Sequence, residues 1–201
     1  MNSRWRWIIA AVALALALAL AIVWQRSAAV PEGNLAGSSL GGAFALVNQD
    51  GKPVTDRDFA GQYRLMYFGY TFCPDVCPTD VGFIARGLVD YEKTRPDRGA
   101  RVTPIFITVD PERDDVAAVK AFVSAFHPRL IGLTGTAAAV IAAQKTFGIY
   151  SKKVATSDPA NYLVDHFAVI YLFGPDGEPI AFLPHGSTAA DVTQMLETYV
   201  R

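Results

Sequence analysis

The chain has few residues that can hold a metal ion or form a disulfide: its 201 residues include two cysteines and three histidines. Structural zinc usually takes four ligands, so two thiolates with no further cysteine make a poor closed zinc site. Runs of like charge are lacking as well, since beyond Arg26 the chain has 15 basic and 19 acidic residues without a block of one sign. This balance favours neither nucleic-acid binding nor a second contact with a membrane surface.

One long apolar segment stands apart from this ordinary composition. Ile8 to Val23 contains no polar residue. At about 1.5 Å per helical residue, Trp5 to Trp24 reaches roughly the 30 Å of a bilayer's hydrocarbon core, and Arg4 and Arg6 mark the short N-terminal end as cytoplasmic. We predict that residues 1–26 form an uncleaved N-terminal transmembrane helix. The remainder would face the periplasm from a bacterial inner membrane.

The same segment has two other interpretations. Ser27-Ala28-Ala29 offers small residues for cleavage of a signal peptide. A mitochondrial presequence is disfavoured, because such peptides are amphipathic and rich in Arg and Ser. Residues 27–40 are rich in Gly, Ser, Ala and Pro and predict a flexible tether, which leaves one globular domain over 41–201.

The domain alternates between apolar strands and amphipathic helices, which is typical of an α/β fold with a mixed sheet. A thioredoxin-like fold is the natural candidate, because the cysteine pair lies between the first central strand and its helix. Helices are expected from the second cysteine to about Tyr91, and over Asp114–Phe126, Thr136–Phe147 and Ala189–Tyr199. Strands are expected over Phe44–Val47, Lys52–Val54, Arg64–Tyr70, Val102–Val109, Leu130–Leu133, Phe167–Phe173 and Ile180–Leu183.

Cys73 and Cys77 are four positions apart at the start of a predicted helix. One helical turn brings them to the same side, and the helix N-terminus favours thiolate over thiol. Thiolates there can attack disulfides or bind metal, and Cu(I) is satisfied by two sulfurs and one imidazole. A structural disulfide is the competing interpretation, although so short a loop would constrain the unfolded chain little.

Three histidines are available as a further ligand. His166 precedes the strand that, in a thioredoxin-like sheet, runs beside the cysteine-bearing strand, and it occupies the neighbourhood of the thioredoxin cis-proline. Asp165 is a candidate to orient its ring. A merely hydrogen-bonded histidine is the alternative. His127 and His185 are typical loop histidines, with His185 the reserve ligand.

The segment Asp110-Pro111-Glu112-Arg113-Asp114 reads most simply as a turn that caps the next helix. A second interpretation gives Asp110 a role close to the cysteine loop, because it ends a central strand at the same edge of the sheet.

Several short segments of the domain form a recognisable set: Gly51-Lys52-Pro53-Val54-Thr55, Tyr67-Phe68-Gly69-Tyr70-Thr71-Phe72-Cys73-Pro74-Asp75-Val76-Cys77-Pro78, Asp110-Pro111-Glu112-Arg113-Asp114, Gly132-Leu133-Thr134-Gly135-Thr136, Asp165-His166 and Gly174-Pro175-Asp176-Gly177. With these segments the chain resembles, over about Phe44 to the C-terminus, the Sco/SenC family of copper-binding assembly factors for cytochrome c oxidase.

The resemblance implies Cys73, Cys77 and His166 as ligands of Cu(I) and also Cu(II). It implies that the protein receives copper from an upstream periplasmic donor and serves the binuclear copper site of cytochrome c oxidase subunit II. A metallochaperone without turnover is the leading hypothesis. The alternative is a thiol:disulfide oxidoreductase that uses Cys73 and Cys77 to reduce the client's cysteines, and a redox or copper sensor is a third.

Overall fold

The computed structural model describes residues 4–5, 7–8, 12–18, 33–156 and 161–201, and the chain divides into two units, Met1–Asn34 and Leu35–Arg201. In the first unit residues 12–18 are helical, with exposed leucines such as Leu14 and Leu16. Within the described residues, no helix has the length and apolar character needed to cross a membrane. Most of the expected anchor, and residues 27–32 of the expected tether, lie outside the described residues.

A mixed sheet forms the centre of the second unit. Its strands, as far as the structure describes the chain, are β1 (Ala45–Asn48), β2 (Pro53–Thr55), β3 (Tyr63–Gly69), β4 (Val102–Thr108), β5 (Ile131–Thr134), β8 (Val169–Phe173) and β9 (Pro179–Pro184). They lie in the order β2-β1-β5-β4-β3-β8-β9. Strands β3, β4 and β5 are parallel, whereas β8 is antiparallel to β3 and β1 to β5. The predicted α/β, thioredoxin-like class is confirmed.

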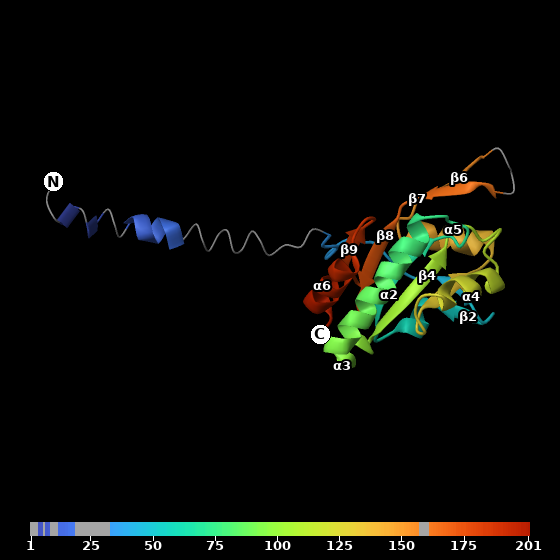
Figure 1. Ribbon diagram of the computed structural model, residues 1–201, viewed down its shortest axis with the longest axis horizontal. Coiled ribbons are helices and arrows are strands. Elements are labelled where there is room, and N and C mark those ends of the chain that lie inside the picture. The colour runs from blue at the N-terminus through green and yellow to red at the C-terminus, as the bar shows by residue number, and fades with distance from the viewer. Residues whose placement is uncertain (1–3, 6, 9–11, 19–32, 157–160) are drawn as a thin grey trace. The chain divides into compact units, whose positions relative to one another are not determined.

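Helices cover both faces of this sheet. They are α2 (Val76–Thr94), α3 (Pro96–Gly99), α4 (Val116–Ser124), α5 (Ala137–Thr146) and α6 (Ala189–Tyr199), with a 3-10 turn η1 (Asp56–Phe59). Helix α2 crosses in front of the sheet beside α6 (Figure 1). The expected long elements are present, and their ends differ from the prediction by a few residues.

The buried strand β3 shows how the two faces are assigned. Its side chains alternate between the faces, as in any strand. Tyr67 donates its hydroxyl to Asp80 of α2 at 3.2 Å, whereas the Phe68 ring lies 5.4 Å from that of Phe147, directly after α5. On the same face as Tyr67, Phe106 of β4 packs against Phe122 of α4. Helices α2 and α4 therefore cover one face and α5 the other.

A second, two-stranded sheet was not expected. Strands β6 (Ser151–Val154) and β7 (Leu163–His166) pair antiparallel, with Ser151 opposite His166, and extend beyond the main sheet (Figure 1). The sequence placed His166 before a strand at Phe167–Phe173, but it is the last residue of β7, and β8 begins at Val169. The hairpin escaped prediction because Ser-Lys-Lys-Val is polar and largely exposed, without a regular alternation.

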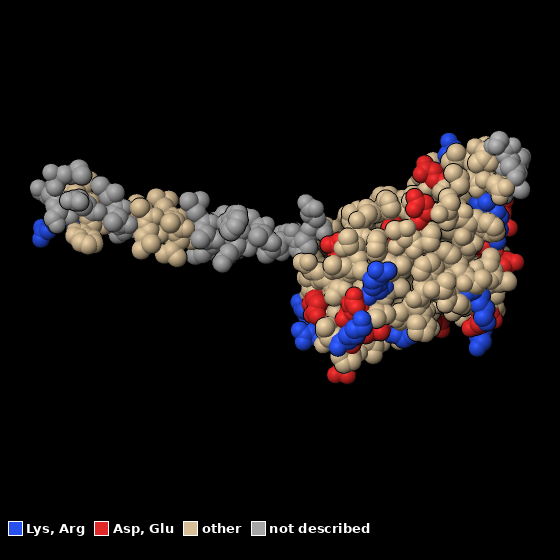
Figure 2. Space-filling view, viewed as in Figure 1, with Lys and Arg blue, Asp and Glu red and all other residues tan. Residues whose placement is uncertain are grey.

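The surface carries both signs of charge. Figure 2 shows Lys and Arg side chains next to Asp and Glu at the α3 end of the domain, where Lys93 pairs with Asp90 and Arg95 with Glu197. Such a mixed surface agrees with the near-neutral composition.

Candidate metal centre

The cysteine loop begins where β3 ends, at Gly69. A side chain at this position would lie 2.9 Å from the Cys77 sulfur and 2.8 Å from the Tyr67 ring. Glycine therefore leaves the space into which the second thiol packs. The loop then turns through Tyr70, whose carbonyl accepts a hydrogen bond from the Cys73 amide at 3.2 Å.

The two thiols are free and have different surroundings. Cys77, in the first turn of α2, is fully buried, whereas Cys73 is partly exposed in the loop. The Cys77 amide donates to the Cys73 sulfur at 3.3 Å. Hydrogen bonding from the Cys77 thiol and from backbone amides lowers the pKa of Cys73 to about 5. The same thiol pair and burial raise the pKa of Cys77. Cys73 is thus the thiolate, and Cys77 keeps its proton.

His166 closes the other side of the site. Its Nε2 lies 3.4 Å from the Cys77 sulfur. The ring stands edge-on to Tyr67 and Tyr70, with centroids 6.3 and 5.9 Å away. Burial lowers the pKa of His166, so the imidazole is neutral at neutral pH and retains a lone pair.

The spacing of these donors suits a shared metal ion. A nitrogen at about 2.0 Å and a sulfur at about 2.3 Å from one ion stand roughly 3.5 Å apart when the angle between them is near tetrahedral. The Cys77 sulfur and His166 Nε2 meet this separation. No set of three Cys, His, Asp or Glu side chains in the described part of the chain is fully arranged as a metal site. Two of the predicted ligands, Cys77 and His166, therefore face each other, and Cys73 is the more exposed of the two thiols.

A cavity of about 420 Å³ opens onto this site, and its walls include Tyr70, Cys73, Asp75, His166 and His185. The site is thus reachable from solvent on the side of Cys73. A thiolate and a neutral imidazole that line an open cavity, with a buried thiol next to them, can bind a soft cation or exchange with a disulfide.

The other predicted histidines have different partners. His185 lines the cavity wall, and its Nδ1 lies 3.1 Å from the buried carboxylate of Asp80. His127 is buried, accepts the Arg129 amide at 3.1 Å and faces Glu92, which is a structural role. Asp165 is exposed on β7, opposite Lys152 of β6. Neighbouring strand residues point to opposite faces, which separates its side chain from that of His166.

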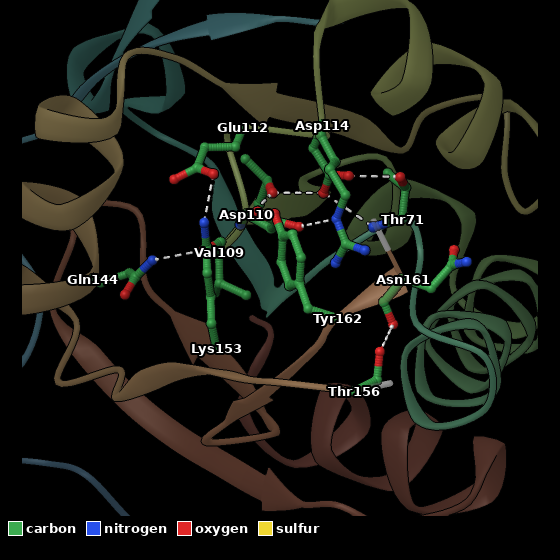
Figure 3. Close-up of polar contacts among 12 residues, drawn as sticks. Thr71, Val109, Asp110, Glu112, Asp114, Gln144, Lys153, Thr156, Asn161 and Tyr162 are labelled. Atoms are coloured by element: carbon green, nitrogen blue, oxygen red, sulfur yellow. Dashed lines mark hydrogen bonds and ion pairs between the residues drawn. The ribbon is translucent and has the colours of Figure 1, made fainter. Parts of the chain in front are cut away.

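Asp110 is held by two side chains, neither of which is a thiol. It pairs with Arg113 at 2.6 Å and accepts the hydroxyl of Tyr162 at 2.7 Å (Figure 3). Sequence reasoning missed Tyr162 and Asp80, and also the role of Asp114, which accepts hydrogen bonds from Thr71, whereas Asp115 is the residue that caps α4. Their roles depend on contacts between distant segments, and no local pattern signals them.

The fold and the site define a thioredoxin-like domain that brings a cysteine pair and a histidine together. Comparison with known proteins agrees: the family model described as SCO1/SenC matches residues 32–201. The chain belongs to the SCO1/SenC family.

Relatives and solved structures extend this match. Protein SCO1 homolog 1, mitochondrial, of Arabidopsis thaliana is 40% identical over 159 residues, which are 79% of this chain and 46% of the relative. Protein SCO1 homolog, mitochondrial, of Homo sapiens is 37% identical over 164 residues, 81% of this chain and 53% of the relative. The chain thus matches about half the length of these curated relatives.

The crystal structure of Arabidopsis thaliana ScoI with copper bound superimposes with a TM-score of 0.74 at 35% identity, covering 79% of this chain and 96% of that one. The structure of Bradyrhizobium japonicum ScoI with copper bound superimposes with a TM-score of 0.72 at 40% identity, covering 80% of this chain and 99% of that one. The likeness is therefore one of the whole globular domain.

Proposed function

We propose that this protein binds copper as cargo through Cys73, Cys77 and His166. The observation that carries the proposal is the 3.4 Å approach of His166 Nε2 to the Cys77 sulfur, between segments 89 residues apart in sequence. The copper-bound ScoI structures, similar over the whole domain, support the same cargo.

The chemistry of the donors suits this cargo. Soft sulfur ligands select Cu(I), and a neutral imidazole suits copper in either oxidation state. The Cys73 thiolate needs no deprotonation at neutral pH, because its pKa is lowered to about 5. Cys77 releases its proton on binding, so copper uptake liberates protons. An open cavity on the Cys73 side lets a partner reach the ion.

The client that follows from the family resemblance is the binuclear copper site of cytochrome c oxidase subunit II, with an upstream periplasmic protein as copper donor. The apolar run Ile8–Val23 supports a tether to a bacterial inner membrane, with the domain on the periplasmic side. In this role the protein is a metallochaperone without turnover.

The test is a Cu(I) titration of the reduced protein against a chromophoric chelator, with wild type, His166→Ala, Cys73→Ser and Cys77→Ser. Substitution of a residue that hydrogen-bonds a metal ligand already costs about 10–100-fold in metal affinity. Loss of a ligand itself should therefore cost at least as much. His185→Ala is the matched control and should bind like wild type. Wild-type affinity in His166→Ala would refute the three-ligand site.

A second function, thiol:disulfide exchange, is favoured by the unequal thiols. The partly exposed Cys73 thiolate would attack a client disulfide, and Cys77 would then displace the client from the mixed disulfide. The client gains two electrons and leaves as a dithiol, while Cys73 and Cys77 form a disulfide. His166→Ala separates the functions, because it should lose copper affinity and keep the exchange rate.

A further inference from the structure

The proposed ligands come from two segments that share no main-chain pairing in the described structure. Cys73 and Cys77 follow β3 of the main sheet, whereas His166 ends β7, which pairs with β6 alone. A metal site needs its donors placed to within a fraction of an ångström. Only two residues separate His166 from β8, which pairs with β3, but the rest of the β6–β7 hairpin needs further contacts to fix it relative to the cysteine loop.

The turn Asp110–Asp114, between β4 and α4, holds the cysteine loop. Asp114 accepts the Thr71 amide at 3.0 Å, the Thr71 hydroxyl at 2.6 Å and the Thr108 hydroxyl at 2.6 Å. Its carboxylate is fully buried. Thr71 is two residues before Cys73, so these bonds fix the start of the loop (Figure 3).

The same turn also holds the hairpin. Tyr162, directly before β7, donates its hydroxyl to Asp110 at 2.7 Å, and its ring lies under the Arg113 guanidinium, 3.6 Å from Cζ to the centroid. Glu112 pairs with Lys153 of β6. Figure 3 shows Tyr162 and Lys153 converging on Asp110 and Glu112 from the hairpin.

Arg113 joins the two attachments. Besides Tyr162, its guanidinium lies 4.9 Å from the ring of Phe72 and 5.8 Å from that of Tyr70, both in the cysteine loop. Its Nε pairs with the buried Asp110 at 2.6 Å. Cations over aromatic faces are attracted most strongly where water is excluded, and this side chain is only 14% exposed.

We propose that Tyr162 and Arg113 are positioning residues that set the place of His166 relative to Cys73 and Cys77. The Asp110–Asp114 turn is the frame to which both ligand-bearing segments are attached. This proposal rests on the proposed function for its effect on copper, although the attachment itself is a property of the metal-free protein.

The first test is a double-mutant cycle between Tyr162 and His166. Tyr162→Leu removes the hydroxyl and the ring, and should weaken Cu(I) binding about tenfold or more, the usual cost of a residue behind a metal ligand. In the His166→Ala background the same change should have an effect of less than about twofold, because no imidazole remains to be positioned. Equal losses in both backgrounds, or no loss in either, would overturn the proposal.

Tyr162→Phe and Tyr150→Leu are the controls. Tyr162→Phe keeps the ring over Arg113 and loses only the hydroxyl. Its Cu(I) affinity should lie between the affinities of wild type and Tyr162→Leu. Tyr150 is an exposed tyrosine of the same hairpin, next to β6. Tyr150→Leu removes a ring from the hairpin outside the contacts with Arg113 and Asp110, and wild-type affinity is expected. A loss as large as that of Tyr162→Leu would contradict the specific role of Tyr162.

Hydrogen exchange of the metal-free protein supplies a readout independent of copper. Tyr162→Leu should speed exchange of the β6–β7 amides while the amides of β3 and β4 keep wild-type protection. Unchanged protection of the hairpin would refute the attachment. If instead the hairpin loosens but His166→Ala binds copper like wild type, the three-ligand site fails and the attachment stands.

Discussion

At the residue scale, the two cysteines have distinct chemical states because Cys77 lies in the first turn of α2 and Cys73 lies in the loop before it. Cys77 is inside the first helical turn and buried against Gly69, whereas Cys73 accepts the Cys77 amide from the loop. Backbone amides at a helix N-terminus stabilise negative charge on a nearby sulfur. The pair therefore combines one thiolate with one protonated thiol, an arrangement that serves metal uptake and disulfide attack alike.

The different protonation states of Cys73 and Cys77 predict how the rate of cysteine alkylation depends on pH. The pKa of Cys73 is lowered to about 5, so its thiolate is complete above about pH 6 and is lost as the pH falls through 5. The iodoacetamide rate of the reduced, metal-free protein should be nearly flat from about pH 6.5 to 8, whereas an ordinary thiol with a pKa near 8.5 gains almost tenfold per pH unit there. Alkylation reactions quenched at timed intervals and analysed by mass spectrometry measure this rate at each pH.

Cys73→Ser is the control for this profile, since the remaining thiol, Cys77, is fully buried. Its alkylation should be slow throughout. A steep rise of the wild-type rate between pH 7 and 9 would show that Cys73 is an ordinary thiol.

At the element scale, sequence patterns predicted the elements whose burial follows a regular period. Ala189–Tyr199 is helical as expected, because its apolar positions recur at helical spacing and Thr188 caps it. The β6–β7 hairpin follows no such pattern, and its place depends on Tyr162, Asp110 and Arg113 meeting across about 50 residues. The candidate ligands were predictable because they lie in motifs, whereas the contacts that hold them were not.

Close packing of α2 on α6 gives a second prediction. A side chain on Gly87 would lie 2.6 Å from the Ala189 carbonyl oxygen and from Val192 Cβ. We expect Gly87→Ala to lower the free energy of unfolding by about 1–3 kcal/mol, because overpacking forces the helices apart. Urea unfolding of the metal-free protein measures this change.

Gly82, on the same helix, is a matched control, since nothing lies within 4 Å of a side chain placed there. Gly82→Ala should raise the free energy of unfolding by about 0.5–1 kcal/mol through helix propensity alone. Equal stability of the two variants would mean that the helices do not meet as closely as described.

At the scale of the whole molecule, the globular unit has its own core and begins before the residues that sequence composition assigned to it. The Leu35 amide donates a hydrogen bond to the Ile180 carbonyl at 2.9 Å, and the Gly41 amide donates one to the Thr146 carbonyl at 3.1 Å. Leu35 and Leu40 also pack against the core. The proposed copper ligands and the Asp110–Asp114 turn all lie within this unit, Leu35–Arg201.

It follows that the N-terminal segment and the copper site should be separable. We expect Leu35–Arg201 to be soluble and to bind Cu(I) with an affinity within about twofold of that of the full-length protein, since every ligand and its supports remain.

The full-length protein should fractionate with membranes and keep its complete mass, because Ile8–Val23 matches the apolar length of a spanning helix. Fractionation followed by intact-mass measurement tests this expectation. A mass lacking the first 29 residues would show signal cleavage instead, and a full-mass protein in the soluble fraction would refute the anchor while leaving the copper site untouched.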